Sequence, residues 1–446
     1  MTKDHDAIRR AAFAAALSSA DKSRLLTAGS ANQVAGLPIP FALELLLDCN
    51  VLPLGVVFEL LAEPGVGKTT FGYELGRIIY EYGGWTEMFL TEGKISPILS
   101  SAIMGYEDEC LREGKPLPFF SHQSMDMQDW QAQTIERVKF TLNLWQKGGT
   151  VNDVKIPKGA YQPVQYLVDS IMGQNLRATD EKVADEGAGG RGYAIEAGSL
   201  TTYLRTIQKY IAAGPFILTL INHLKPQPAS QPFMPPELNS PGGKQVRFQA
   251  TYRIGMKKGS QFAHVTDPGS AASLVTRGHV IHMFLLKNSL GSDSNRISVP
   301  YQWTFVKDEV TGETKQRSEF VWSAALVKYL LDEVHEGLPK QIPNTQKAKA
   351  ALVERLDSVV HFRQIKKGKF TSKTFGVTSE APMTTRELGD AIQQSPEILE
   401  GLRDLFGVKR YTVWNPDENY FALKDRMAKA VDKLATQLPQ SVKSSR

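Results

Sequence analysis

Cysteine is almost absent from this chain of 446 residues, which has only Cys49 and Cys110, far apart in the sequence. Two separated cysteines provide neither a disulfide framework nor a cluster of metal-binding thiolates, and they fit a reducing compartment. The first six residues, 1–6, are mostly polar and have no apolar stretch behind them. We therefore expect no secretory signal at this end.

Long uncharged apolar runs are lacking as well. The most apolar stretch, residues 41–62, contains the acids Glu44, Asp48 and Glu59 and also Pro53. Charges at this density argue against a membrane span. The stretch instead predicts a helix, a turn and a first core strand.

The chain also lacks a strong charge imbalance and internal repeats. Its formal net charge of +5 permits a polyanionic partner but does not require one. Hydrophobic residues make up 42% and charged residues 22%, which is ordinary for a soluble globular protein. The length predicts a core domain of about 250 residues with smaller appendages.

What the sequence does have is a glycine-bearing loop between a β-prone apolar run, residues 55–61, and a helical pattern, residues 70–82. The order of strand, glycine-bearing loop, Lys-Thr and helix binds nucleoside triphosphates. Backbone N–H groups of such a loop and the positive end of the helix attract the phosphates. A chance glycine-rich turn is the alternative. The candidate binding residues are Glu63, Pro64, Gly65, Val66, Gly67, Lys68, Thr69 and Thr70.

Two of these side chains have specific roles in the motif. Lys68 is expected to reach the β- and γ-phosphates of ATP, and the Thr69 hydroxyl is expected to ligate Mg²⁺. Ala62 stands where the motif usually has its first glycine, although Gly65 and Gly67 are present nearer the lysine. The motif indicates ATP and Mg²⁺ as cofactors, but many proteins with different functions share it.

Apolar strands and helical patterns alternate through the next part of the chain. This alternation predicts an α/β fold with a mostly parallel sheet and helices on both faces. We expect strands at 56–61, 86–90, 164–169 and 216–221, helices at 70–82, 126–147 and 195–213, and later antiparallel strands at 245–256, 278–286 and 298–305.

Polar residues stand at the ends of three of these strands. Asp169 is placed to join the Mg²⁺ shell, or else it caps a loop. Glu92 lies where ligands bind in open α/β sheets and can deprotonate an attacking water, or it is an ordinary surface residue. Asn222 and His223 can sense the γ-phosphate through a hydrogen bond that ADP does not make, or His223 merely caps its strand.

Two long loops, 177–193 and 225–243, are rich in glycine or proline. Long loops inside a compact domain are usually functional or disordered. The second loop is followed by a specific segment, Pro241-Gly242-Gly243-Lys244-Gln245-Val246-Arg247-Phe248, with Arg253 five residues later.

With these motifs in this order, the chain resembles the RecA-type recombinases from about residue 36 to 310. The Gly-Gly segment is the most specific element of the resemblance, because helicases that share the core fold do not normally show it. The resemblance implies that Glu92 is the hydrolytic glutamate, Asp169 the Mg²⁺-shell aspartate and His223 the nucleotide sensor. A histidine at the sensor position is similar to the phage UvsX-like branch of the family.

The resemblance also implies a DNA interface on the two loops. Basic residues would neutralise phosphates and apolar side chains would stack on bases or insert between them. The implied DNA-binding residues are Arg177, Arg191, Tyr193, Lys225, Phe233, Gly242, Gly243, Lys244, Arg247 and Arg253.

Some implied contacts concern a neighbouring protomer or the base of the nucleotide. Lys287 matches a lysine that reaches the neighbour's ATP, and Phe248 matches a coupling aromatic residue. Ser289 replaces a second lysine, while Ser96 and Leu99 stand where bacterial members place an Asp and a Tyr against adenine. Ser289 leaves charge compensation between protomers open, and Ser96 and Leu99 leave base selectivity open.

The expected activity is that of a DNA-dependent ATPase that forms filaments on single-stranded DNA and exchanges strands with duplex DNA. A single-strand-binding protein or a loader would be a further partner, in the cytoplasm of a bacterium or of a phage-infected host cell. A hexameric replicative helicase and a recombination mediator that does not hydrolyse ATP are the alternatives.

Residues outside this core predict appendages. A helix at 7–26 is either a docking arm for polymerisation or a surface helix, which gives domains of 1–35, 36–320 and 321–446. The last domain is expected to be a small α+β unit that resembles a winged helix. Its helices are predicted at 320–336, 384–393 and 396–406 and its hairpin at 411–414 and 420–423.

The segment 361–375 in this last domain is basic, contains three phenylalanines and has no acidic residue. It is expected either to steer duplex DNA or to be a solvated linker.

Overall fold

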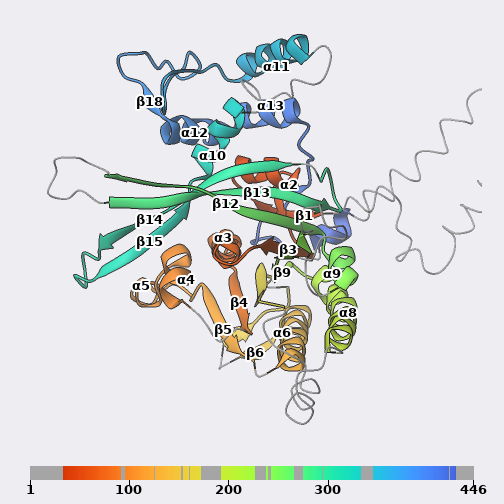
Figure 1. Ribbon diagram of the computed structural model, residues 1–446. Helices are drawn as coiled ribbons and strands as arrows, with labels where there is room; N and C mark the ends of the chain where they lie inside the picture. The colour runs from red at the N-terminus through yellow and green to blue at the C-terminus, as the bar shows by residue number, and fades with distance from the viewer. Residues whose placement is uncertain are drawn as a thin grey trace, which may run out of the picture.

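The computed structural model has a nine-stranded sheet at its centre, in the order β15-β14-β13-β12-β3-β9-β8-β4-β5 (Figure 1). The strands from β12 to β5 pair in parallel, and those from β15 to β12 pair antiparallel. The fold is therefore mixed α/β with a large, mostly parallel central sheet. The structure describes residues 34–91, 96–124, 126–151, 154–159, 161–171, 192–226, 238–239, 243–265, 275–293, 295–332, 345–420 and 422–427.

The inner parallel strands β3, β9 and β8 are buried on both faces, which explains why they appear as apolar runs, whereas the edge strand β5 is partly exposed. β3 is the strand before the phosphate loop, and it lies between β9 and β12. The bounds are β3 (Val56–Ala62), β9 (Phe216–His223), β8 (Val164–Asp169), β4 (Trp85–Leu90) and β5 (Phe119–Gln123). The predicted strands at 56–61, 86–90, 164–169 and 216–221 are confirmed.

Helices cover both faces of this sheet, as the alternation predicted. Gly72 of α3 (Lys68–Glu81) lies against Leu167 of β8. The preceding residue, Tyr166, donates a hydrogen bond to the Thr141 hydroxyl of α6 (Met127–Lys147) at 3.2 Å. Adjacent residues of a strand point to opposite faces, so α3 and α6 lie on opposite sides. α8 (Gly192–Ala212) packs beside α6.

The antiparallel strands are long and extend beyond the helices as two hairpins (Figure 1). They are β12 (Tyr252–Val265), β13 (Val275–Asn288), β14 (Arg296–Lys307) and β15 (Thr314–Phe320). The prediction of a strand at 245–256 is wrong in its first half, because α9 (Gly243–Gln249) precedes β12. Apolar Val246, Phe248 and Ala250 alternate in the sequence as in a strand, but Val246 and Ala250 are buried on one helical face while Phe248 is 69% exposed.

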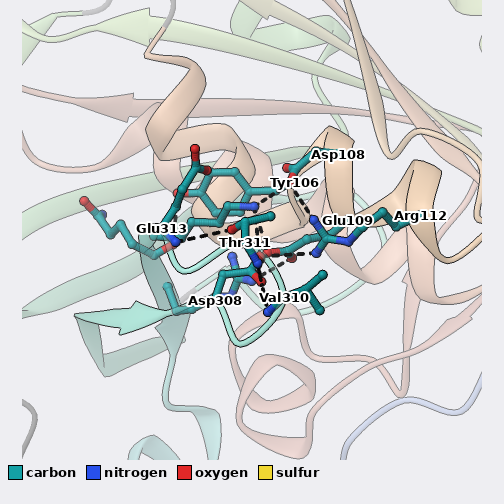
Figure 2. Close-up of polar contacts among 11 residues, drawn as sticks. Tyr106, Asp108, Glu109, Arg112, Asp308, Val310, Thr311 and Glu313 are labelled. Atoms are coloured by element: carbon teal, nitrogen blue, oxygen red, sulfur yellow. Dashed lines mark hydrogen bonds and ion pairs between the residues drawn. The ribbon is translucent and has the colours of Figure 1, made fainter.

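A dense polar network joins the turn after β14 to α5 (Glu107–Arg112), as Figure 2 shows. The Asp308 carboxylate accepts hydrogen bonds from the N–H groups of Val310 and Thr311 at 2.9 and 3.0 Å. It also pairs with Arg112 and with Lys315. These bonds lower the pKa of Asp308, and the two backbone N–H groups make the largest contributions. The helix that precedes α5 in the chain is α4 (Pro97–Met104).

The residues after 320 form a helical layer with a small sheet. α10 (Trp322–Tyr329) packs on β14, and the other elements are α11 (Thr345–Val359), β16 (Arg363–Lys366), β17 (Lys369–Thr371), β18 (Met383–Thr384), α12 (Thr385–Gln393) and α13 (Pro396–Phe406). The predicted helices at 384–393 and 396–406 are confirmed. The predicted capping box is present, since the Thr384 hydroxyl accepts from the Glu387 N–H and the Glu387 carboxylate accepts from the Thr384 N–H.

The basic segment 361–375 forms the β16–β17 hairpin rather than a linker. Phe362 and Phe370 are buried and pack edge to face with their ring centres 6.1 Å apart. Lys366 and Lys367 at the turn are exposed. The aromatic residues therefore anchor the hairpin, and its charges face solvent.

The end of the described chain returns to its beginning. β19 (Thr412–Val413) pairs in parallel with β1 (Ala35–Pro38), which also pairs with β2 (Val51–Pro53). The predicted hairpin at 411–414 and 420–423 is wrong, because β19 finds this distant partner and the residues around 422 are helical. Within α2 (Phe41–Leu47), buried Glu44 forms a two-bond ion pair with Arg403 of α13.

The remaining short strands are β6 (Gly149–Val151), β7 (Val154–Ile156), β10 (Lys225–Pro226) and β11 (Leu238–Asn239). Cys49 and Cys110 are free thiols, and both are buried. In the described part of the chain no helix combines the length and apolarity needed to cross a membrane. The predicted helix at 7–26 lies outside the described residues, and the proposed domain boundaries remain predictions.

Candidate functional site

The loop between β3 and α3, the candidate phosphate cradle, holds two glycines in backbone conformations that other residues rarely adopt. Gly65 and Gly67 have φ angles of 74° and 114°, which disfavour any residue with a Cβ atom. No side chain caps the first turn of α3. N–H groups at such a helix start carry partial positive charge and bind anions.

Lys68 lies at the start of α3 with its side chain folded back across this loop. The buried ammonium group donates to the carbonyl oxygens of Ala62 and Glu63, each at 3.0 Å. A phosphate oxygen in their place would give a stronger, charge-assisted bond. The ammonium is thus held at the position where a nucleotide's phosphates would enter the cradle.

The structure explains why Ala62 can replace the usual glycine. Within the described ranges, Asp48 is the one non-glycine residue with a positive φ angle. Ala62 is instead the last residue of β3 and pairs with His223 in the sheet. An extended residue tolerates a methyl group, so this departure leaves the loop geometry intact.

Thr69 and Asp169 meet at the same edge of the sheet. The Thr69 hydroxyl donates to the Asp169 carboxylate at 2.6 Å. Hydroxyl and carboxylate oxygens are ligands that Mg²⁺ prefers, usually together with waters and substrate phosphates rather than an all-protein cage. The described residues contain no cluster of three or more His, Cys, Asp or Glu side chains suited to a metal. The oxygen pair next to the loop therefore fits a Mg²⁺ ion that is held jointly with a nucleotide.

Thr91, just after β4, binds the neighbouring strand end. Its hydroxyl accepts from the Ser170 N–H at 2.7 Å and donates to the Ser170 carbonyl at 2.6 Å. The Asp169–Ser170 peptide bond is cis. The two hydrogen bonds of the Thr91 hydroxyl join the end of β4 to the turn that follows Asp169.

A buried carboxylate in β3 organises the other side of the site. Glu59 accepts from the Asn222 side chain at 2.8 Å and forms an ion pair with Arg253 of β12. Asn222 also accepts from the His223 N–H through its side-chain oxygen at 2.9 Å. Arg253 is thus placed in the sheet with a side chain only 13% exposed, and the sensor candidates Asn222 and His223 lie beside β3.

Lys287 binds the end of the helix that follows the second loop. Its ammonium donates to the carbonyl oxygens of Arg247, Phe248 and Ala250 at 2.9, 2.8 and 2.7 Å. A cation is favourable at the negative end of a helix. Burial and then the charge of Arg253 lower the pKa of Lys287. Phe248 is 69% exposed.

Ser96, Leu99 and Ser289 differ from the residues that RecA-type recombinases have at the matching positions, and each has a local contact here. The Ser96 hydroxyl caps α4 by accepting from the Leu99 N–H at 3.3 Å, and Leu99 packs partly buried against the core. The Ser289 N–H donates to the Thr251 carbonyl at 3.0 Å.

Other predicted residues cannot be placed. Glu92, Arg177, Arg191, Phe233 and Gly242 lie outside the described residues. Gly243 begins α9, while for Tyr193, Lys225 and Lys244 only the backbone element is described.

Sequence reasoning missed Glu59 and Thr91. Glu59 gives a signal, because it is a lone acid inside an otherwise apolar strand, and buried charges are normally paired. Thr91 gives none, since a threonine at a strand end is common and only its distant partner distinguishes it.

No known protein-family model matches this chain, and no curated protein sequence matches it.

Proposed function

We propose that this protein is a DNA-dependent ATPase that assembles on single-stranded DNA and exchanges strands, as its likeness to RecA-type recombinases implies. The observation that carries the nucleotide part is the meeting of the glycine loop, Lys68 and the Thr69–Asp169 pair at one sheet edge. The N–H groups of the loop, the Lys68 ammonium and the Thr69 and Asp169 oxygens, which lie 2.6 Å apart, together suit a Mg²⁺-nucleotide. Glu92 would orient and deprotonate the attacking water.

The DNA part is supported by where the two candidate loops begin. One follows β8, which ends at Asp169, and the other follows β9, which ends at His223. Both chain segments therefore leave the sheet beside the nucleotide loop. A ligand that favours one arrangement of such loops can make DNA binding depend on ATP.

Self-association is supported by the surface around α9. Phe248 and Leu286 are 69% and 42% exposed. Lys287 is adjacent and would reach the neighbour's ATP after leaving the carbonyl groups of α9. Exposed apolar residues beside charged groups are common at protein interfaces.

Duplex DNA would meet the β16–β17 hairpin. The segment 361–375 has no acidic residue, and its lysines at the turn are exposed whereas Phe362 and Phe370 are buried. The turn offers exposed charge, and two of the segment's three phenylalanines are buried, which suits a phosphate backbone better than unstacked bases.

Electron microscopy with single-stranded DNA and a non-hydrolysable ATP analogue tests the proposal. We expect helical filaments, together with ATP turnover that single-stranded DNA stimulates. Glu92→Gln should abolish the stimulated turnover and leave ATP binding intact. Discrete hexameric rings would support a helicase instead, and filaments without turnover would support a mediator.

A further inference from the structure

Thr91 occupies a buried position between two strand ends that carry candidate chemistry. It directly follows β4, and its side chain is only 4% exposed. Its N–H donates to the Asp169 carbonyl at 3.0 Å, which continues the pairing of β4 with β8 by one residue. The backbone thus places Thr91 beside the end of β8.

The Thr91 hydroxyl then makes two bonds to a single residue. It accepts from the Ser170 N–H at 2.7 Å and donates to the Ser170 carbonyl at 2.6 Å. Ser170 is fully buried, so water cannot readily replace the hydroxyl. Donor and acceptor together restrict rotation of the turn just after Asp169.

That turn directly follows Asp169, the last residue of β8. The carboxylate lies 2.6 Å from the Thr69 hydroxyl, so a small shift would separate the two oxygens that suit Mg²⁺. Mg²⁺ demands a near-octahedral arrangement at short distances and tolerates little displacement of its ligands. Groups that hold metal ligands in place often matter for affinity nearly as much as the ligands themselves.

We propose that Thr91 is a positioning residue, whose hydroxyl orients the Asp169 carboxylate, through Ser170, for a nucleotide-bound Mg²⁺ ion. The inference rests on the proposed nucleotide site. It adds a residue that neither the nucleotide motif nor the family resemblance indicated.

Three variants of the full chain separate this role from a purely structural one. Thr91→Val keeps the shape and removes the hydroxyl, and Thr91→Ser keeps the hydroxyl. Thr86→Val is the matched control, because Thr86 lies on the same strand, is fully buried and bonds the Gln165 side chain at 3.0 Å. If Thr91→Val does not fold, Thr91→Ala carries the same expectation.

The measurement is the affinity of a fluorescent ADP analogue, titrated with Mg²⁺ and repeated in EDTA. Thr91→Val should raise the Mg²⁺ concentration for half-saturation by about 10-fold or more. Its affinity for the nucleotide in EDTA should change by less than about twofold, because the charged contacts of Lys68 remain. Thr91→Ser and Thr86→Val should both behave like the wild type.

Two results would overturn the role of Thr91. One is a Mg²⁺ dependence in Thr91→Val equal to that of Thr86→Val. The other is an equal loss of affinity with and without Mg²⁺, which would indicate general damage to the site. If the wild-type chain itself binds no nucleotide, the proposed function fails, and this outcome is distinct from both.

Discussion

Within the parallel strands and at their ends, the carboxylates of Glu59 and Asp169 have specific partners, whereas charged groups around the β14–β15 turn form a shared network. Asp169 accepts from Thr69, and Glu59 is held by Asn222 and Arg253. By contrast, Lys315 alone pairs with Asp108, Glu109 and Asp308.

The two regions also differ in how they can respond to a ligand. In the turn region, opposite charges already neutralise one another, and Lys315 and Arg317 lie 5.1 and 4.9 Å from the centre of the Tyr106 ring. At the strand ends, a helix start without a side-chain cap and two glycines offer N–H groups to an anion. We infer that the turn region stabilises the fold and that chemistry belongs at the strand ends.

The largest expected effect comes from breaking the buried ion pair between Glu59 of β3 and Arg253 of β12. Arg253→Met should lower the free energy of unfolding by about 3 kcal/mol, because Glu59 would be left as an uncompensated buried charge. Denaturant titration measures this loss. Arg112→Met, which removes a cation from the turn region, should cost clearly less, since Lys315 and two backbone N–H groups of the turn still bind Asp308. Equal losses would contradict the distinction between the regions.

Lys68→Ala should separate the two regions by function. We expect nucleotide affinity to fall by about 100-fold, which corresponds to the loss of charge-assisted bonds to phosphate. Lys315→Ala should leave nucleotide affinity unchanged and lower the thermal midpoint. Isothermal titration and thermal unfolding of both variants check this. A similar loss of affinity in Lys315→Ala would remove the basis for placing the chemistry at the strand ends.

A third polar cluster, at the outer edge of the sheet, sharpens the comparison through pH. Burial alone would raise the pKa of Glu87, but hydrogen bonds from His122 and Arg137 outweigh it and lower the pKa to about 2. The carboxylate therefore stabilises the fold at neutral pH, and this contribution is lost as pH falls from its ordinary value of 4.5 toward 2.

Wild type and Glu87→Gln should consequently respond differently to acid. Between pH 6 and pH 3 the wild type should lose about 2 kcal/mol more stability than the variant. Unfolding curves recorded across this range give the difference. Parallel pH profiles would show that Glu87 has the same affinity for protons in the folded and unfolded states.

The smallest effect is expected in the turn region itself. Arg317→Met removes the ion pair to Glu109 and the cation beside Tyr106, yet the Arg317 side chain is 40% exposed. Exposed pairs and cation–π contacts contribute little, so the loss should be about 1 kcal/mol. Hydrogen exchange should increase locally in β14 and β15. A loss as large as that of Arg253→Met would show that exposure does not govern these contacts.

Local patterns predicted many elements of this fold correctly. The capping box at Thr384 and Glu387 located α12, and Pro396 with Gly407 marked the two ends of α13. These signals lie within a few residues of the structure they specify. The apolar spacing of the segment 245–249 fits either a helix or a strand, and only packing decides between them.

By itself, the sequence determined the glycine loop, the helix behind it and the alternation of strands and helices. Each of these depends on backbone preferences and on side-chain spacing along a short stretch of chain. The tertiary structure decided that β3 lies between β9 and β12, that Thr69 meets Asp169, and that Thr91 binds Ser170. These contacts join residues about 80 to 200 positions apart, and they follow from the order in which strands pair, which short-range preferences do not encode.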